Sequence, residues 1–282
     1  MLTTVKAGPY TIRGVSVGGI YTSLALPELG VLLDVGLAAR SAAAHDVLLL
    51  SHAHADHVGS LMTLLGLRGL TNRGPLRLVM PAAIVDTLMD GLRAMSKLQR
   101  YELTIEPEGV VAGDELQLKG DLWVRAFPTF HPVPSLGYQL FRRVNKLKPE
   151  LVGLEGREIA ARRKAGEDVH VVVDRPEVAY ATDTLIEVIE ETPAILESKV
   201  LILECSFLDE RKDRQSSRAG CHVHLDEIAS RADRFANEHL VLMHFSQIYK
   251  PQEVKPLLEE RLPPGLFRRV IPFVTRRKHW PG

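Results

Sequence analysis

The chain has 282 residues, and its 35 lysines and arginines balance 35 aspartates and glutamates, so its formal net charge is zero. Hydrophobic residues make up 45% of the chain and charged residues 25%, which is typical of a globular protein and excludes a disordered one. Any affinity for nucleic acid must therefore come from a local basic patch, and no apolar run approaches the ~18 residues of a membrane helix.

Short β segments separated by glycines fill the first part of the chain. Gly14, the pair at 18–19 and Gly30 punctuate these segments, as turn residues do between strands. We expect strands at 10–12, 15–17, 20–26 and 31–33.

The most informative stretch follows an apolar run at residues 46–50, which predicts a buried strand. Residues 51–57 then read Ser-His-Ala-His-Ala-Asp-His, an H-x-H-x-D-H motif, and residues 58–70 have helical apolar spacing. The motif is therefore expected on a loop at the carboxyl end of a strand. Imidazole and carboxylate are ligands that Zn²⁺ prefers, and four such groups in two pairs suggest two metals. The alternative is a histidine-rich loop without metal, which this density of ligand-type residues disfavours.

The rest of the chain alternates strands and helices. We expect strands at 76–80, 116–118, 122–127, 137–141, 178–181, 200–203 and 240–243, and helices from Pro81 to about Arg100 and near 184–197, 224–238 and 251–261. This alternation predicts an α/β protein with sheet layers covered by outer helices. No repeat or linker divides the chain, so we expect a single domain over residues 1–282.

Three further ligand-type residues each follow a predicted strand. They are His131, Asp183 and His244. Active sites of layered α/β folds collect at strand ends, although an aspartate there is more often a turn residue or a helix N-cap. We predict two metal groups that share Asp183 as a bridge. The first group is His52, His54 and His131, and the second is Asp56, His57 and His244.

Several stretches together resemble the tRNase Z family, in its short plant-like form, within the metallo-β-lactamase superfamily. The matching stretches are the motif at 51–57, Phe130-His131 with Ser135-Leu136-Gly137-Tyr138, and residues 177–184, 203–209, 222–224 and 244–249. The S-x-G-Y and H-F-S-x-x-Y patterns are more specific to tRNase Z than the histidine motif. The resemblance implies an αββα sandwich that binds two Zn²⁺, or Mn²⁺ or another divalent metal. It also implies a homodimeric endoribonuclease that removes the 3′ trailer of precursor tRNA with a metal-activated hydroxide.

The resemblance also implies a catalytic set of Asp56, Glu204 and His222. In the family, a glutamate after a buried strand orients a histidine that protonates the leaving oxygen. His224 lies two positions away and competes for this role, because spacing alone does not separate the two histidines.

A basic segment at about 142–176 matches the family's arm, which holds tRNA away from the metals. Between residues 142 and 166, eight basic residues stand against three acidic ones. Phosphate contacts dominate affinity for nucleic acid, so the segment is expected to bind substrate, and its alternative is a solvated surface helix. The expected substrate-binding residues are Arg142, Arg143, Arg162, Arg163 and Lys164.

Two residues depart from the family pattern: Ile248 stands at a usual arginine and Cys221 at a usual glycine. Two alternative functions therefore stay open. One is hydrolysis of a cyclic nucleotide or another small phosphodiester, which the basic arm disfavours. The other is a non-catalytic RNA-binding paralogue, which the intact ligand set disfavours.

Cellular location is predicted from two weak signals. Residues 1–6 lack the basic-then-apolar layout of a signal peptide. Cys205 and Cys221 are too few for a disulfide framework. Both signals favour a cytoplasmic protein with reduced thiols and no membrane attachment.

Overall fold

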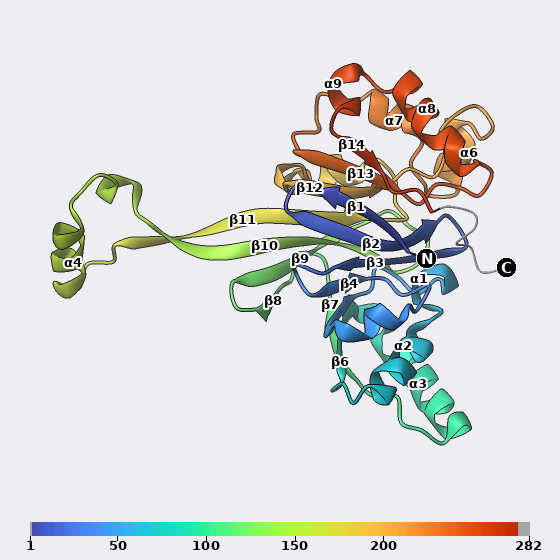
Figure 1. Cartoon of the computed structure of the whole chain (residues 1–282), viewed down its shortest axis with the longest axis horizontal. Helices are drawn as coiled ribbons and strands as arrows, with labels where there is room; N and C mark the ends of the chain where they lie inside the picture. The colour runs from blue at the N-terminus through green and yellow to red at the C-terminus, as the bar shows by residue number, and fades with distance from the viewer. Residues whose placement is uncertain (1, 276–282) are drawn as a thin grey trace.

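The computed structural model describes residues 2–275, so the ends of the predicted 1–282 domain lie outside the described residues. Two seven-stranded sheets pack face to face in the described part (Figure 1). The first sheet runs in chain order through β1 (Thr3–Ala7), β2 (Tyr10–Val17), β3 (Tyr21–Leu26), β4 (Val31–Leu33), β5 (Val47–Leu49), β6 (Leu76–Pro81) and β7 (Ile105–Val110). The second sheet has the order β14 (Val270–Pro272), β13 (His239–Met243), β12 (Val200–Glu204), β11 (His170–Ala181), β10 (Leu136–Leu147), β9 (Leu122–Pro128) and β8 (Glu115–Lys119).

Helices cover the outer face of each sheet. The first sheet carries η1 (Arg40–Ala44), α1 (Ala55–Val58), α2 (Leu61–Leu70), η2 (Ala82–Ile84) and α3 (Val85–Gln99). The second carries α5 (Val188–Glu191), η4 (Pro193–Glu197), α6 (Arg214–Ala219), α7 (Leu225–Ala229), α8 (Pro251–Arg261) and α9 (Pro264–Phe267). Figure 1 shows α2 and α3 on one side of the sheets and α7 to α9 on the other. The predicted αββα sandwich is thus confirmed, and no helix among residues 2–275 is long and apolar enough to cross a bilayer.

The central strands are buried on both faces. In β4, Val31 and Leu33 pack between the two sheets, whereas Leu32 packs against the outer helices. Leu49 of β5 likewise faces the other sheet, and Leu48 faces outward. Side chains alternate across a strand, and burial on both faces explains why these strands appear in the sequence as continuous apolar runs.

Parallel pairing sets the position of the functional site. Strands β4 to β7 are parallel to one another, as are β11 to β14. The carboxyl ends of β4 and β5 lead to Asp34 and the histidine motif, and those of β11 and β13 lead to Asp183 and His244. An isolated β-bridge pairs Gly18 with Ser246. Gly18 follows β2 of the first sheet and Ser246 lies just after β13 of the second, so the bridge connects the two sheets at this edge.

Strands β10 and β11 continue beyond the sheet as a two-stranded ribbon. They stay paired out to Leu147 opposite His170, and the segment between them forms η3 (Pro149–Leu151) and α4 (Gly156–Lys164). Figure 1 shows this ribbon leading away from the body, with α4 at its far end. The ribbon and its tip coincide with the predicted arm at 142–176.

Several predicted boundaries were wrong. Residues 10–17 form one strand, because Gly14 lies inside it, where a Cβ would be 1.9 Å from the Ser23 carbonyl oxygen. Pro81 ends β6, and the following α-helix begins at Val85. The helices predicted at 184–197 and 224–238 are shorter than expected, since regular helix covers only 188–191 and 225–229, with a 3₁₀ turn at 193–197.

Three strands were not predicted from the sequence: β1, β7 and the three-residue β14. β1 has the sequence Thr-Thr-Val-Lys-Ala, whose few apolar residues do not distinguish a strand from an irregular segment at the start of the chain. β7 contains Pro107 between two glutamates, which reads against a strand, and it is tolerated because β7 is the edge of its sheet.

Candidate metal centre

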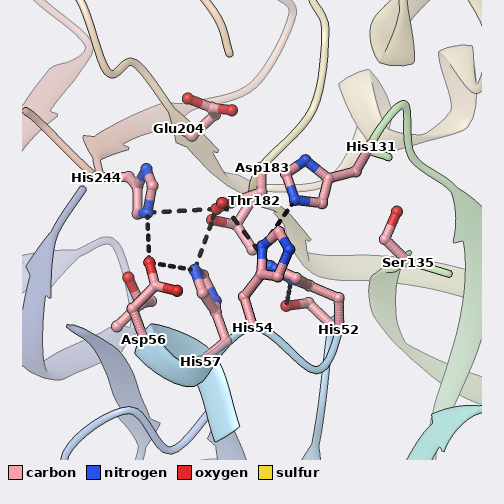
Figure 2. A network of polar contacts seen from close by, with 12 residues as sticks. His52, His54, Asp56, His57, His131, Ser135, Thr182, Asp183, Glu204 and His244 are labelled. Atoms are coloured by element: carbon pink, nitrogen blue, oxygen red, sulfur yellow. Dashed lines mark hydrogen bonds and ion pairs between the residues drawn. The ribbon is translucent and has the colours of Figure 1, made fainter. Parts of the chain in front are cut away.

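All of the predicted metal ligands converge at the carboxyl edge of the sheets. They form two groups in which the possible ligand atoms lie within 4.8 Å of one another. The first group is His52, His54, His131 and Asp183, and the second is Asp56, His57, Asp183 and His244. The grouping is the one predicted from the sequence, with Asp183 common to both, and Figure 2 shows its carboxylate between the histidines.

The two oxygens of Asp183 point toward different histidines. Its Oδ1 lies 3.2 Å from Nε2 of His57 and 3.3 Å from Nε2 of His244. Its Oδ2 lies 3.8 Å from Nε2 of His52. The carboxylate can therefore contribute one oxygen to each of two metal ions.

Several imidazole nitrogens in this cluster are buried without a hydrogen bond. These are Nε2 of His52, His57 and His244, and Nδ1 of His131. An unsatisfied buried polar atom is costly, so native structures seldom leave one without a partner. The three Nε2 atoms lie 3.2 to 3.8 Å from the oxygens of the Asp183 carboxylate, and cations bound beside that carboxylate would satisfy them. The donor set of imidazoles and carboxylates fits Zn²⁺.

Charges within the cluster set the protonation of its members. Burial, assisted by neighbouring histidines, lowers the pKa of His52 to about 3, which keeps this imidazole neutral, as a metal ligand must be. Burial opposes the charged form of Asp183, but His244 and His57 outweigh it and lower its pKa well below the usual range. The same balance with His244 and His57 lowers the pKa of Asp56.

The local backbone explains how these ligands reach one point. Asp56 and His57 do not lie on a loop as predicted, because they belong to the single turn α1. His244 directly follows β13, and Asp183 follows β11 after one residue, Thr182; the two adopt positive φ values of 61° and 45°. Non-glycine residues rarely adopt this conformation, and such strain is typical of functional sites.

Asp34 supports the ligands from behind and was missed by the sequence analysis. Its fully buried carboxylate accepts hydrogen bonds from the backbone and hydroxyl of Ser51 at 2.7 and 2.8 Å and from the Tyr180 hydroxyl at 2.6 Å. Its Oδ2 also lies 2.7 Å from Nδ1 of His57. A carboxylate on the second nitrogen of a ligand histidine fixes ring orientation. The signal was available, because Asp34 follows a strand as Asp183 does.

A second network lies beside the metal groups. Nδ1 of His222 lies 3.0 Å from Oε1 of the fully buried Glu204, which also accepts a hydrogen bond from the backbone of Thr184. Ser206 donates to Oε2 of Glu204 at 2.6 Å and lies 3.1 Å from Nδ1 of His244. Burial disfavours a charged His222, but the Glu204 carboxylate outweighs it and raises the pKa of His222 to about 9.

His222 and His224 have different surroundings. The ring centroid of His222 lies 5.5 Å from that of His244 and 6.3 Å from that of His131. His224 is instead the N-cap of α7, where its Nδ1 accepts from the backbone of Asp226. The geometry thus favours His222 as the histidine that faces the metal groups.

Comparison with known proteins identifies the family. The profile of the Beta-lactamase superfamily domain matches residues 32–245. The tRNase Z TRZ1 of Arabidopsis thaliana is 36% identical over 264 residues, which cover 93% of this chain and 94% of that protein. The chain belongs to the tRNase Z family.

Solved structures agree with the fold. The short form of human tRNase Z has a TM-score of 0.57 at 18% identity, with 88% of this chain and 93% of that chain covered. The metallo-β-lactamase fold protein YhfI from Bacillus subtilis has a TM-score of 0.60 at 15% identity, with 96% and 94% covered. These likenesses support the metallo-β-lactamase fold.

The patterns specific to tRNase Z have structural roles near the candidate metal groups. Gly137 of S-x-G-Y packs against Phe127, whose ring would lie 2.1 Å from a Cβ at this position. Tyr138 donates to the Leu50 carbonyl just before the histidine motif. In H-F-S-x-x-Y, the Tyr249 hydroxyl accepts from the backbone of Leu208 at 2.7 Å. Both patterns therefore hold the loops that carry the ligands.

The two departures from the tRNase Z pattern lie close to this network. Cys221 has a φ of 56°, in the region that favours glycine, so the substitution places strain directly before His222. The side chain of Ile248 is exposed and follows His244 by four positions.

The predicted substrate-binding residues fall into two separate groups. Arg142 and Arg143 lie where the ribbon leaves the sheet and form ion pairs with Asp121 and with Asp174. Arg162, Arg163 and Lys164 form the last turn of α4 at the tip. Only the second group faces solvent at the far end of the arm.

Proposed function

We propose that the protein removes the 3′ trailer of precursor tRNA as an endoribonuclease of the tRNase Z family. The observation that carries this proposal is the 36% identity with tRNase Z TRZ1 along almost the entire length of both proteins. The convergence of every predicted ligand in one cluster supports hydrolysis rather than RNA binding alone. Family membership makes the chain a metal-dependent hydrolase.

The proposed site holds two divalent ions, with Zn²⁺ the best match to the donor set. His52, His54 and His131 would hold one ion, and Asp56, His57 and His244 the other, with Asp183 between them. When bound, two such metals activate a water molecule and neutralise charge on the entering and leaving oxygens of a phosphodiester. The Asp34 carboxylate keeps His57 oriented for this task.

His222 is proposed to give a proton to the departing 3′ oxygen of the tRNA. Its Nδ1 faces Glu204, which leaves the opposite edge of the ring available to the substrate. A carboxylate in this position fixes the tautomer and stabilises the protonated ring. Glu204 is itself held by Thr184 and Ser206, so it acts as an oriented support.

The arm is proposed to bind tRNA at a distance from the metals. Its tip helix α4 ends in Arg162, Arg163 and Lys164, and Figure 1 shows α4 at the opposite end of the molecule from α1. Because the tip is remote from α1 in its own chain, we propose a homodimer in which one subunit's arm serves the other's site. Light scattering at micromolar protein tests this assembly, and a monomer would contradict it.

The thiols are compatible with the proposed cytoplasmic location. Cys205 and Cys221 are both free, and the first is fully buried. Reduced thiols are the rule in that compartment.

Precursor tRNA and a model substrate, bis(p-nitrophenyl) phosphate, together test the proposal. Replacing Arg162, Arg163 and Lys164 with glutamate should strongly weaken binding of the precursor and reduce its salt dependence, because phosphate contacts release counterions. Hydrolysis of the model substrate should stay unchanged, since that substrate reaches only the metals. Equal losses on both substrates would show that α4 supports the fold. No loss on either would favour a small phosphodiester as the natural substrate.

A further inference from the structure

The ribbon that carries α4 loses its neighbours where it leaves the second sheet. Pairing of β10 with β9 ends at Arg142 opposite Leu122, and pairing of β11 with β12 begins only at Val178. Beyond these points the arm is two strands without a third. A two-stranded ribbon is marginally stable alone, so its direction relative to the body depends on what holds its root.

Four charged side chains meet at that root, and we call them the root clamp. They are Glu115 of β8, Arg125 of β9, Arg143 of β10 and Asp174 of β11. Arg143 binds both oxygens of Asp174 at 2.8 Å and one oxygen of Glu115 at 2.8 Å. Nε of Arg125 donates to the other oxygen of Glu115 at 2.8 Å.

Aromatic rings close one side of the root clamp. The Arg143 guanidinium lies 4.6 Å from the ring centroid of Trp123 and 5.2 Å from that of Phe141. Isolated surface ion pairs contribute little, whereas bidentate pairs within a network hold a defined geometry. Each of these side chains is about one-third exposed or less, so the network is partly shielded from water.

The opposite side of the root is held by Glu177. The register shifts between Leu140 and Phe141, which leaves Glu177 as the extra residue of a β-bulge after Pro176. Bulges redirect a side chain and bend a strand. The fully buried Glu177 carboxylate accepts from the Tyr10 hydroxyl and from Lys199 at 2.6 Å and from Arg175 at 2.7 Å. Tyr10 belongs to the first sheet, so the root is fixed to both layers.

We propose that the root clamp is a positioning device that makes the arm a lever of fixed direction relative to the body, and thereby sets where its tip lies relative to the metal centre that it serves. In this account Asp174 and Glu115 determine preference for a large substrate without touching it. The functional part of this inference rests on the proposed function. A substrate that is already bound to the tip reaches the metal centre within the same complex. The effective concentration for this second contact depends on how stiffly the arm is connected to the body.

The variant Asp174→Asn distinguishes positioning of the arm from a direct effect of charge on RNA binding. The change removes a negative charge from a phosphate-binding arm, so charge alone predicts tighter binding of precursor tRNA. A loosened lever predicts the reverse: the KM for precursor tRNA should rise roughly tenfold. The kcat/KM for bis(p-nitrophenyl) phosphate should stay within about twofold, because that substrate does not use the arm. Unchanged or tighter use of the precursor would overturn the functional part.

A distance measurement tests the lever itself, whatever the substrate is. Nitroxide labels at Ala161→Cys on α4 and Glu259→Cys on α8, in a Cys221→Ala background, report the distance from tip to body by electron double resonance. With the labelled protein diluted into an excess of unlabelled protein, so that distances between subunits are not recorded, the otherwise unchanged protein should give one narrow distribution. Asp174→Asn should broaden it, and Asp174→Glu, which keeps the charge, should restore it.

Glu155→Gln is the matched control. It also converts a carboxylate to an amide on the arm and removes an exposed ion pair with Arg157, but it lies at the tip. Its distribution should stay narrow. Equal widths for Asp174→Asn and the parent, or a parent distribution that is already broad, would overturn the clamp. If the parent does not cleave precursor tRNA, the proposed function fails while the distance measurement still tests the lever.

Discussion

The Nδ1 atom of His222 lies 3.0 Å from Oε1 of Glu204, and this pair stands beside His244, a proposed metal ligand, without joining either of the two predicted metal groups. A histidine held in this way is suited to proton transfer. The same two residues and His244 also lie close enough to hold an ion themselves, so the two roles must be separated by experiment.

Removal of the His222 imidazole provides that separation. His222→Ala should lower turnover of precursor tRNA by roughly 10²-fold, the usual scale of general acid catalysis. The loss on bis(p-nitrophenyl) phosphate should be smaller, because its leaving group needs little protonation. Steady-state kinetics on both substrates and metal analysis check this.

His224→Asn is the matched control, since asparagine keeps an acceptor for the N-cap of α7. Its activity should stay near that of the unchanged protein. Loss of bound metal in His222→Ala, or similar losses on both substrates, would indicate that His222 is a ligand.

Asp183 gives the test of the shared metal bridge. Asn fits the positive φ at this position, so Asp183→Asn removes charge while it preserves the backbone. The unchanged protein should hold close to two metal equivalents per chain, and the variant one or fewer. The cost in metal affinity should at least match the roughly 10- to 100-fold loss that follows removal of a residue supporting a ligand. Elemental analysis after metal supplementation measures both, with the exposed Asp86→Asn as the control. Two equivalents in Asp183→Asn would contradict the bridge.

The positive φ of Cys221 predicts stabilisation by glycine. Cys221→Gly should raise the free energy of unfolding by about 1 kcal/mol, because strain released in the folded state exceeds the added freedom of the unfolded chain. Cys221→Ala keeps the Cβ and should give no gain. Urea unfolding of the three proteins compares them, and equal gains for glycine and alanine would trace the effect to the thiol.

The buried carboxylate of Glu177 predicts a pH-dependent contribution to stability. Burial alone would raise its pKa, but hydrogen bonds from Lys199, Tyr10 and Arg175 lower it below the usual value. A lowered folded-state pKa means that the stabilisation is complete above the unfolded-state value of about 4.3 and is lost as the pH falls through the folded-state value.

Glu177→Gln should therefore cost about 1–3 kcal/mol at pH 7. The difference from the unchanged protein should shrink below about pH 4. Chemical denaturation at a series of pH values measures it. A constant difference down to pH 3 would show that the effect comes from packing rather than charge.

The residues that could be predicted share one property, which is a local signal. Four of the proposed ligands stand in one motif directly after an apolar run, and Asp183 and His244 follow strands that are apolar over several positions. Asp34 gave the same signal and was not recognised, because its role is to support His57 from a distance of 23 positions in the sequence. The layered fold could be predicted because strands and helices alternate along the chain. Strand β7 could not be predicted, because it contains Pro107, which is tolerated in a strand only at the edge of a sheet.

The root of the arm could not be predicted, because its contacts are made by residues far apart in the chain. Glu115 and Asp174 are distant in sequence, and nothing local marks either as a partner of Arg143. The basic pattern at 142–166 instead grouped Arg143 with Arg162 as RNA contacts. In the folded chain Arg143 is engaged with two carboxylates, and that pairing depends on the register of β10 and β11.

Mapping the products from a precursor tRNA tests the central claim most directly. The metal-loaded protein is incubated with a trailer-bearing precursor, and both new RNA ends are determined. Protonation of a departing 3′ oxygen predicts a tRNA that ends in a 3′-hydroxyl and a trailer that begins with a 5′-phosphate, with both products formed roughly 100-fold more slowly by His222→Ala. An intact precursor beside rapid hydrolysis of bis(p-nitrophenyl) phosphate would contradict the assignment of precursor tRNA as the substrate.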